Sequence, residues 1–135
     1  MRVPTYIDAD TQRLSEVPEG DFLSTVGNGI AEGHAVLSGS TPAADLSSAG
    51  SFELTLSDNT TVSFTTPPSD GTCGFTFAVT QDASGSGFTV IWPASVKRPG
   101  GTVPELTADA DKTDVFVFTT RDGASYTGMT AGKNI

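Results

Sequence analysis

A cysteine–histidine catalytic pair or a zinc site in this chain would have to use His34 and Cys73, because the sequence holds one histidine and one cysteine. A cysteine nucleophile needs a base beside it, and the sequence leaves a pairing of these two residues open. Cys73 shares the apolar side of a predicted strand with Phe75 and Phe77, where a cysteine packs as a small hydrophobic residue. One cysteine and one histidine also fall short of the usual zinc ligand set. We therefore expect a protein that is not an enzyme, with no catalytic residue, metal or cofactor.

The acidic residues offer a second kind of chemistry at one cluster. Asp109, Asp111 and Asp114 lie at positions i, i+2 and i+5, which leaves a calcium site open. The segment lacks the glycine and the distant glutamate of an EF-hand loop, and Lys112 lies in its middle. We expect solvated turn acids there. The glycine-rich stretch 85–87 is expected to be a hairpin turn rather than a phosphate-binding loop, because no helix follows it.

A tryptophan followed by a cationic loop is the strongest candidate for recognition. Trp92 ends a predicted strand, Pro93 stops that strand because it has no N–H to donate, and Lys97 and Arg98 follow. With Tyr126, these side chains could form an aromatic platform that stacks on sugar. The alternative is a core anchor followed by a solvated turn, since tryptophan usually buries its ring. The sequence leaves both interpretations open.

Alternating apolar and polar residues predict an all-β domain over residues 50–135. The predicted strands, separated by turn signals, are Ser51–Ser57, Thr61–Thr65, Cys73–Thr80, Phe88–Trp92, Asp114–Thr120 and Ala124–Thr130. Their spacing favours an antiparallel β-sandwich or flattened barrel. The strand-borne phenylalanines are assigned to its core: Phe52, Phe64, Phe75, Phe77, Phe116 and Phe118. Residues 114–120 are apolar on both faces, which predicts a central strand covered on two sides.

The first part of the chain has a different character. Residues 1–33 are predicted to form an extended N-terminal arm, and residues 34–49, rich in Gly, Ala and Ser, a linker with at most a weak strand at 34–38. The arm holds too few apolar residues for a stable two-stranded unit in water. We therefore expect the arm to pack against a partner through its larger apolar side chains. The candidate contacts are Tyr6, Ile7, Leu14, Val17 and Phe22.

Charge narrows the choice of partner. The formal net charge is −9, so phosphate backbones and anionic lipid surfaces are repelled, and we expect neither a nucleic-acid nor a membrane partner. The N-terminal residues lack the apolar region of a signal peptide, and no apolar run reaches the roughly 18 residues of a membrane span. We expect synthesis in a cytosol, and folding without a disulfide framework.

Several motifs resemble a β-structured module of tail fibres and other virion surface proteins of tailed bacteriophages. They span residues 54–65, 67–72, 77–102, 114–128 and 131–134, and the most specific is Trp92–Lys97 followed by Pro-Gly-Gly. Residues 6–21 resemble the leader of phage appendage proteins. The family often has an aromatic residue before Pro-Gly-Gly, where this chain has Arg98, so we expect a charged or exposed loop tip.

The resemblance implies a non-enzymatic virion component, usually a homotrimer, made in the bacterial host and located on the particle surface. We expect a head decoration (cement) or short head-fibre protein, complete as a short polypeptide, whose arm binds the major capsid protein or another virion protein. The alternative is a tail-fibre or baseplate receptor-binding module that holds host surface glycan through Trp92, Tyr126 and the Lys97–Arg98 loop.

Overall fold

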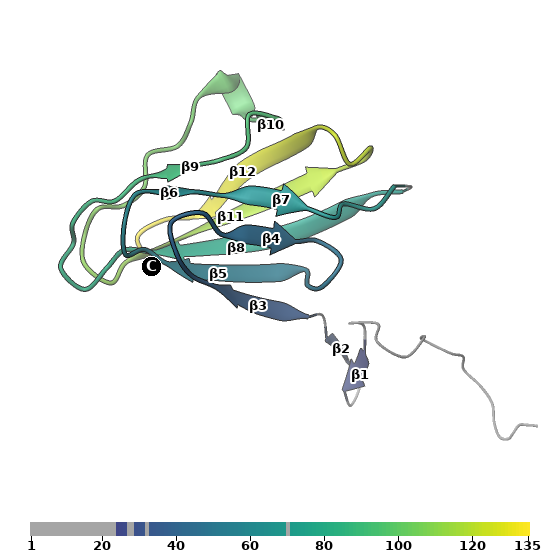
Figure 1. Cartoon of the computed structure of the whole chain (residues 1–135), viewed down its shortest axis with the longest axis horizontal. Helices are drawn as coiled ribbons and strands as arrows, with labels where there is room; N and C mark the ends of the chain where they lie inside the picture. Colours follow the sequence, from purple (N-terminus) through teal and green to yellow (C-terminus); the bar gives the residue numbers. More distant parts are fainter. Residues whose placement is uncertain (1–23, 27–28, 32, 70) are drawn as a thin grey trace, which may run out of the picture. The chain divides into compact units, whose positions relative to one another are not determined.

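The computed structural model describes residues 24–26, 29–31, 33–69 and 71–135 (Figure 1). The chain divides into two compact units, Met1–Glu32 and Gly33–Ile135. In the first unit, β1 (Ser24–Val26) pairs antiparallel with β2 (Gly29–Ala31). The predicted arm contacts Tyr6, Ile7, Leu14, Val17 and Phe22 lie outside the described residues.

The second unit is built on a six-stranded mixed sheet with strand order β10-β12-β11-β8-β5-β3. The strands are β3 (His34–Leu37), β5 (Ser51–Thr55), β8 (Cys73–Thr80), β10 (Val96–Lys97), β11 (Thr113–Thr120) and β12 (Tyr126–Gly132). The all-β fold class is confirmed, and no helix of the described chain is long and apolar enough to cross a membrane. The expectation of antiparallel pairing is wrong in part. Within this six-stranded sheet, β11 pairs antiparallel with β8 and with β12, whereas β3–β5, β5–β8 and β10–β12 are parallel pairs.

Short strands cover one face of this sheet. They are β4 (Ala43–Asp45) paired with β7 (Ser63–Thr65), and β6 (Thr60–Thr61) paired with β9 (Val90–Ile91), both pairs parallel. A 3₁₀ turn, η1 (Pro99–Gly101), follows β10. Phe64 on β7 lies 4.9 Å from Phe75 and 5.1 Å from Phe118, measured between ring centroids, so the short strands pack on the inner face of the sheet.

The core consists of the residues that strand alternation turns inward. On β8, Phe75, Phe77 and Val79 are buried, and on β11 the phenylalanines 116 and 118 are buried. All strand-borne phenylalanines lie in this core or, in the case of Phe64, pack against it, as predicted. The position of β11 between β8 and β12 confirms a central strand. Its second face, with Val115 and Val117, is half-buried rather than fully covered.

Residues 34–49 do not form a linker. They supply β3, the edge strand of the large sheet, and β4, which belongs to the covering layer. Ala44, Leu46 and Ala49 are buried in the core. A segment rich in Gly, Ala and Ser has the composition of a flexible linker, which is why the sequence predicts a linker here. In the structure, the small side chains fit between closely packed strands instead.

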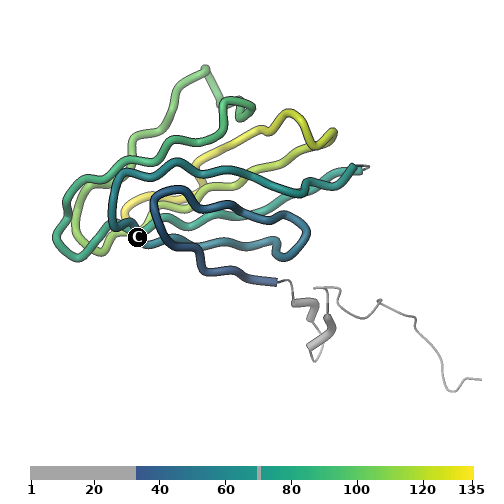
Figure 2. Tube along the Cα trace, viewed as in Figure 1, coloured from purple at the N-terminus to yellow at the C-terminus, as the bar shows by residue number. Residues whose placement is uncertain are grey.

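The loop that follows β8 and the loop that precedes β11 lie side by side at one end of the sheet (Figure 2). The N–H of Gln81 donates to the Lys112 carbonyl at 3.0 Å, and the N–H of Asp111 donates to the Asp82 carbonyl at 3.3 Å. The Gln81 side chain is 2% exposed and closes the loop 82–87, because its Nε2 donates to the Phe88 carbonyl and its Oε1 accepts from the Phe88 N–H. These bonds keep the loop ends fixed.

Asp114 is the buried acid that holds the segment after η1. Its carboxylate accepts hydrogen bonds from the N–H and hydroxyl of Thr107 at 2.7 and 2.8 Å, and from the N–H of Asn134 at 2.9 Å. Burial by itself raises the pKa of this carboxyl, but these bonds and the charge of Lys133 outweigh burial and lower the pKa below its ordinary value of 3.8. The ionised form therefore stabilises the fold.

We expect Asp114→Asn to lower the free energy of unfolding by about 1.5–3 kcal/mol at pH 7, the usual contribution of a hydrogen bond to a charged group. Because the folded-state pKa lies below the unfolded one, this contribution is complete above the ordinary pKa and is lost as the pH falls through the folded-state value. Urea unfolding of wild type and variant across pH 2–7 measures the difference. Asp109→Asn, at an exposed position, is the control. An equal effect of the two substitutions would contradict the role of Asp114.

Candidate binding pocket beside the loop 98–104

The loop that follows Trp92 is held against β12. Phe88, Val90 and Trp92 face inward as predicted, but the predicted strand 88–92 is shortened to β9 (Val90–Ile91). The Val96 N–H then donates to the Pro93 carbonyl at 3.0 Å, and Val96 is 6% exposed. A short parallel pairing between β10 and β12 follows directly. The cationic loop therefore starts from a fixed position.

Two glycines turn the chain after Arg98. Gly100 and Gly101 have φ angles of +65° and +69°, a conformation that other residues rarely adopt. The Gly101 N–H donates to the Arg98 carbonyl at 2.9 Å. Pro99 precedes this turn and restricts the backbone further. The Pro-Gly-Gly sequence thus fixes the course of the chain next to β12.

An open pocket of about 430 Å³ lies between this loop and β12. Its floor is aromatic: the Trp92 ring centroid lies 5.2 Å from that of Phe116 and 5.0 Å from that of Phe118. The remaining lining comes from Arg98, Pro99, Thr102, Pro104, Gly128, Met129 and Thr130. A volume of this size is in the range of small-molecule and side-chain binding sites.

Arg98 gives the pocket its charge. Among the described residues, the single ion pair joins His34 to Glu53, so Arg98 has no acidic partner there although its side chain is half-buried. Lys97 is exposed and lines a neighbouring pocket of about 350 Å³ together with Arg121. Asp122 lines that second pocket too, so the aromatic pocket with Arg98 is the one whose charged lining is positive alone.

The pocket residues are suited to binding rather than to nucleophilic chemistry. The two hydroxyls in the lining, on Thr102 and Thr130, have no carboxylate, imidazole or amine base among the other lining residues. A nucleophile without a base is weak. The aromatic floor and the guanidinium instead fit an apolar group that carries a negative charge.

Of the two interpretations that the sequence leaves open for Trp92 and Tyr126, the structure supports the core anchor over the aromatic platform. Their side chains are 7% and 5% exposed, and burial raises the pKa of the Tyr126 phenol. Trp92 packs edge-on to Phe77 at 5.2 Å, and Tyr126 to Phe64 at 5.1 Å. Stacking on a sugar needs an exposed ring face, so both rings serve as core anchors. The exposed Lys97 and the half-buried Arg98 keep the loop tip charged, as predicted.

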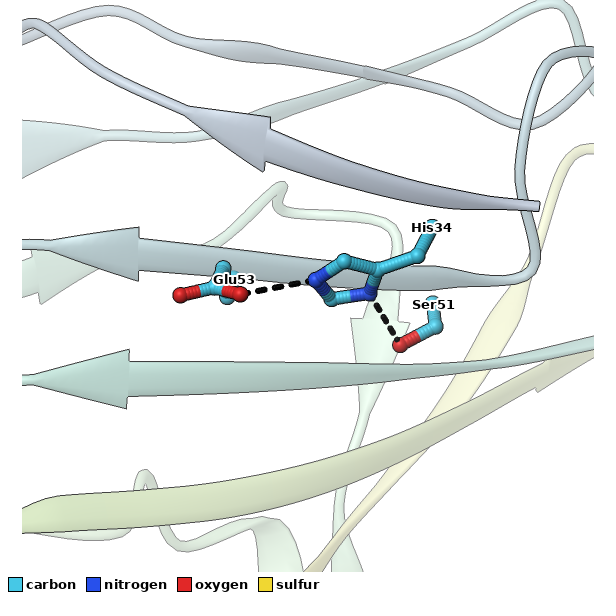
Figure 3. A network of polar contacts seen from close by, with 3 residues as sticks. All are labelled: His34, Ser51 and Glu53. Carbon is cyan, nitrogen blue, oxygen red and sulfur yellow. Dashed lines mark hydrogen bonds and ion pairs between the residues drawn. The ribbon is translucent and has the colours of Figure 1, made fainter.

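His34 and Cys73 do not form a catalytic pair. His34 lies on the exposed side of β3, whereas Cys73 packs against the core at the start of β8, with β5 between the two strands. His34 instead contacts Ser51 and Glu53 (Figure 3). Its Nδ1 lies 2.9 Å from the Ser51 hydroxyl, and its Nε2 lies 2.7 Å from Glu53 Oε1.

This contact resembles a catalytic triad only in its residue types. A carboxylate can only accept, so Nε2 carries the proton that bonds Glu53. The His34 and Glu53 side chains are 47% and 48% exposed. Ser51 and Glu53 are neighbours of His34 through the parallel register of β3 and β5, in which His34 lies opposite Ser51. The cluster is a cross-strand polar contact at the sheet edge.

The acidic cluster does not form a calcium site. The Asp114 carboxylate is occupied by Thr107 and Asn134, while Asp109 and Asp111 are exposed. The described residues contain no group of three potential metal ligands. The expectation of solvated turn acids is therefore right for Asp109 and Asp111 and wrong for Asp114.

Sequence reasoning missed the wall of the pocket that β12 provides. The sequence predicts Gly128 and Thr130 only as part of the strand 124–130. A signal was present, because a glycine inside a strand often marks a close approach of other groups to the backbone. A Cβ placed on Gly128 would lie 2.8 Å from the Phe118 ring and 2.9 Å from Val96.

We expect Gly128→Ala to lower the free energy of unfolding by about 1–3 kcal/mol, the usual cost of overpacking. The Phe118 ring is 2% exposed and has no room to move away from an added methyl group. Urea unfolding followed by Trp92 fluorescence measures the change. Gly74→Ala is the matched control, because its added Cβ would meet its nearest atoms at 3.7 and 3.8 Å, and we expect unchanged or higher stability. A neutral effect at Gly128 would show that the ring does not pack on the strand backbone.

Comparison with known proteins gives no family for this chain, so any function must be argued from the structure itself. No family model, curated protein or solved structure matches the chain. The resemblance to virion surface proteins therefore stays a prediction.

Proposed function

We propose that the chain is a non-enzymatic structural protein on the surface of a tailed-phage particle, most simply a head decoration (cement) or short head-fibre protein. The observation that carries this proposal is the division of the chain at Glu32 and Gly33. Residues 33–135 build an aromatic core with one another. This supports a division of labour in which residues 1–32 attach the protein and the β unit is displayed.

Within this proposal, the six-stranded sheet and its covering strands form a flattened β-sandwich. The partners are further copies of the chain, as a homotrimer, together with the major capsid protein or another virion protein. The net charge of −9 supports a protein partner over nucleic acid or anionic membrane.

A receptor-binding module of a tail fibre or baseplate is the second candidate. The pocket beside the loop 98–104 favours it, since a displayed pocket with a cationic rim is suited to recognition. The buried rings of Trp92 and Tyr126 remove the sugar-stacking platform from this candidate. Host glycan would have to bind through Arg98 and the pocket rim instead.

Deletion of residues 1–32 tests the attachment role. The cut preserves Gly33, whose carbonyl accepts from the Gly50 N–H at 3.0 Å, and the whole of β3. We expect the shortened chain to keep its near-ultraviolet circular dichroism and thermal unfolding temperature, but to lose binding to particles that the encoding phage assembles without this protein. Co-sedimentation with such particles measures binding.

A longer deletion, of residues 1–38, is the folding control. It removes the edge strand β3 and should lower the unfolding temperature, which shows that the assay detects a damaged β unit. If the chain shortened by 32 residues sediments with particles as fully as the intact chain, the arm does not attach the protein and the proposal fails.

A further inference from the structure

Part of the β12 edge has no strand beside it in the described chain. On one side, β12 pairs with β11 from Tyr126 to Gly132. On the other side, β10 pairs with it only at Tyr126 and Thr127. No backbone hydrogen bond to another described segment continues this second edge through 128–130. An unpaired stretch of strand edge is a template for an added strand.

The aromatic pocket lies along this unpaired stretch. Gly128, Met129 and Thr130 form one wall, and the loop 98–104 forms the facing wall. Trp92, Phe116 and Phe118 lie at the floor. An extended segment that continues the line of β10 would therefore bond to the edge and set one of its side chains into the pocket, since alternate side chains of a strand point to the same face.

Charge selects the kind of segment. Arg98 is the one charged residue among those that line the aromatic pocket. The half-buried Arg98 has no acidic partner among the described residues. A guanidinium binds a carboxylate in a two-point geometry, so an acidic residue of the added segment would satisfy it.

We propose that the β12 edge and the aromatic pocket bind an acidic, extended segment of a partner protein. The segment adds to β12 as a strand, sets an apolar or aromatic side chain into the pocket that Trp92 lines, and pairs a carboxylate with Arg98. Strand addition favours a peptide over a free aromatic acid, because a small acid leaves the backbone groups of 128–130 unbonded. This site is separate from the attachment role of residues 1–32 and does not depend on it.

A peptide array with the full-length chain tests the proposal. Each six-residue peptide carries one aspartate and, two residues later on the same face of the strand, a different apolar or aromatic residue, with threonine at the other positions. A twin array carries asparagine in place of aspartate. We expect the chain to be retained on the aspartate array, most strongly where an aromatic residue follows, and weakly on the twin. Equal or no retention on the two arrays overturns the proposal.

The best peptide is then titrated in solution. Trp92 is the sole tryptophan and lines the pocket, so its fluorescence reports occupancy directly. We expect Arg98→Gln to weaken binding about tenfold by loss of a charge-assisted hydrogen bond. Lys112→Gln makes the same change in net charge at an exposed site in another loop, and should change affinity less than about twofold. Equal losses in the two variants would leave only a general charge effect and contradict the site.

Further probes separate strand addition from other occupants. A peptide with alternate backbone nitrogens methylated should bind at least about tenfold more weakly, because it cannot complete the ladder. Equal binding of this peptide, or equally tight binding of phenylacetate alone, overturns strand addition. If Arg98→Gln abolishes self-association of the chain in sedimentation velocity while no peptide binds, a second copy occupies the edge and the assignment to a partner protein is wrong.

Discussion

Aromatic packing between the two layers is the interaction on which the second unit depends. The covering strands β4, β6, β7 and β9 are two or three residues long and pair only with one another, so backbone hydrogen bonds alone do not fix them on the large sheet. Phe64 and Trp92 connect the layers. The Phe64 ring contacts Phe75 and Phe118, and the Trp92 ring contacts Phe77 and Phe118. Each buried aromatic ring contributes about 1.5–3 kcal/mol through burial.

The floor of the pocket is built from the same rings, so core packing fixes its shape. Its floor is part of the core, and its walls are a strand and a loop set by Pro99 and two positive-φ glycines. A site whose side chains are locked by packing is organised before a ligand arrives, which lowers the entropy lost on binding. The same construction limits variation, because Phe118 touches both the pocket and the backbone of Gly128.

Local sequence patterns predicted the strands and the direction of their side chains, because both depend on neighbouring residues. They did not predict which distant strands pair. The two-residue alternation in 73–80 and 114–120 predicted the strands β8 and β11 and their inward phenylalanines. The parallel pairing of β5 with β8 joins residues far apart in sequence, so no turn signal indicates it. The strand β4 was missed because Ala43–Asp45 carries no β-branched or aromatic residue. For the site, the cationic loop was visible in sequence, whereas the burial of Trp92 depends on what packs above it.

The unpaired edge of β12 has a local cause in the prolines of the preceding loop. Pro93 and Pro99 bracket β10, and neither has an N–H to donate to a ladder, so β10 is limited to Val96 and Lys97. The turn at Gly100 and Gly101 then leads the chain away from β12 and leaves the pocket between them. At its far end the same strand has an irregular register with β11, between Val115 and Phe116. Bulges increase the local twist of a strand and help to keep an edge from open-ended pairing, so this irregularity favours a short added segment over extended sheet growth.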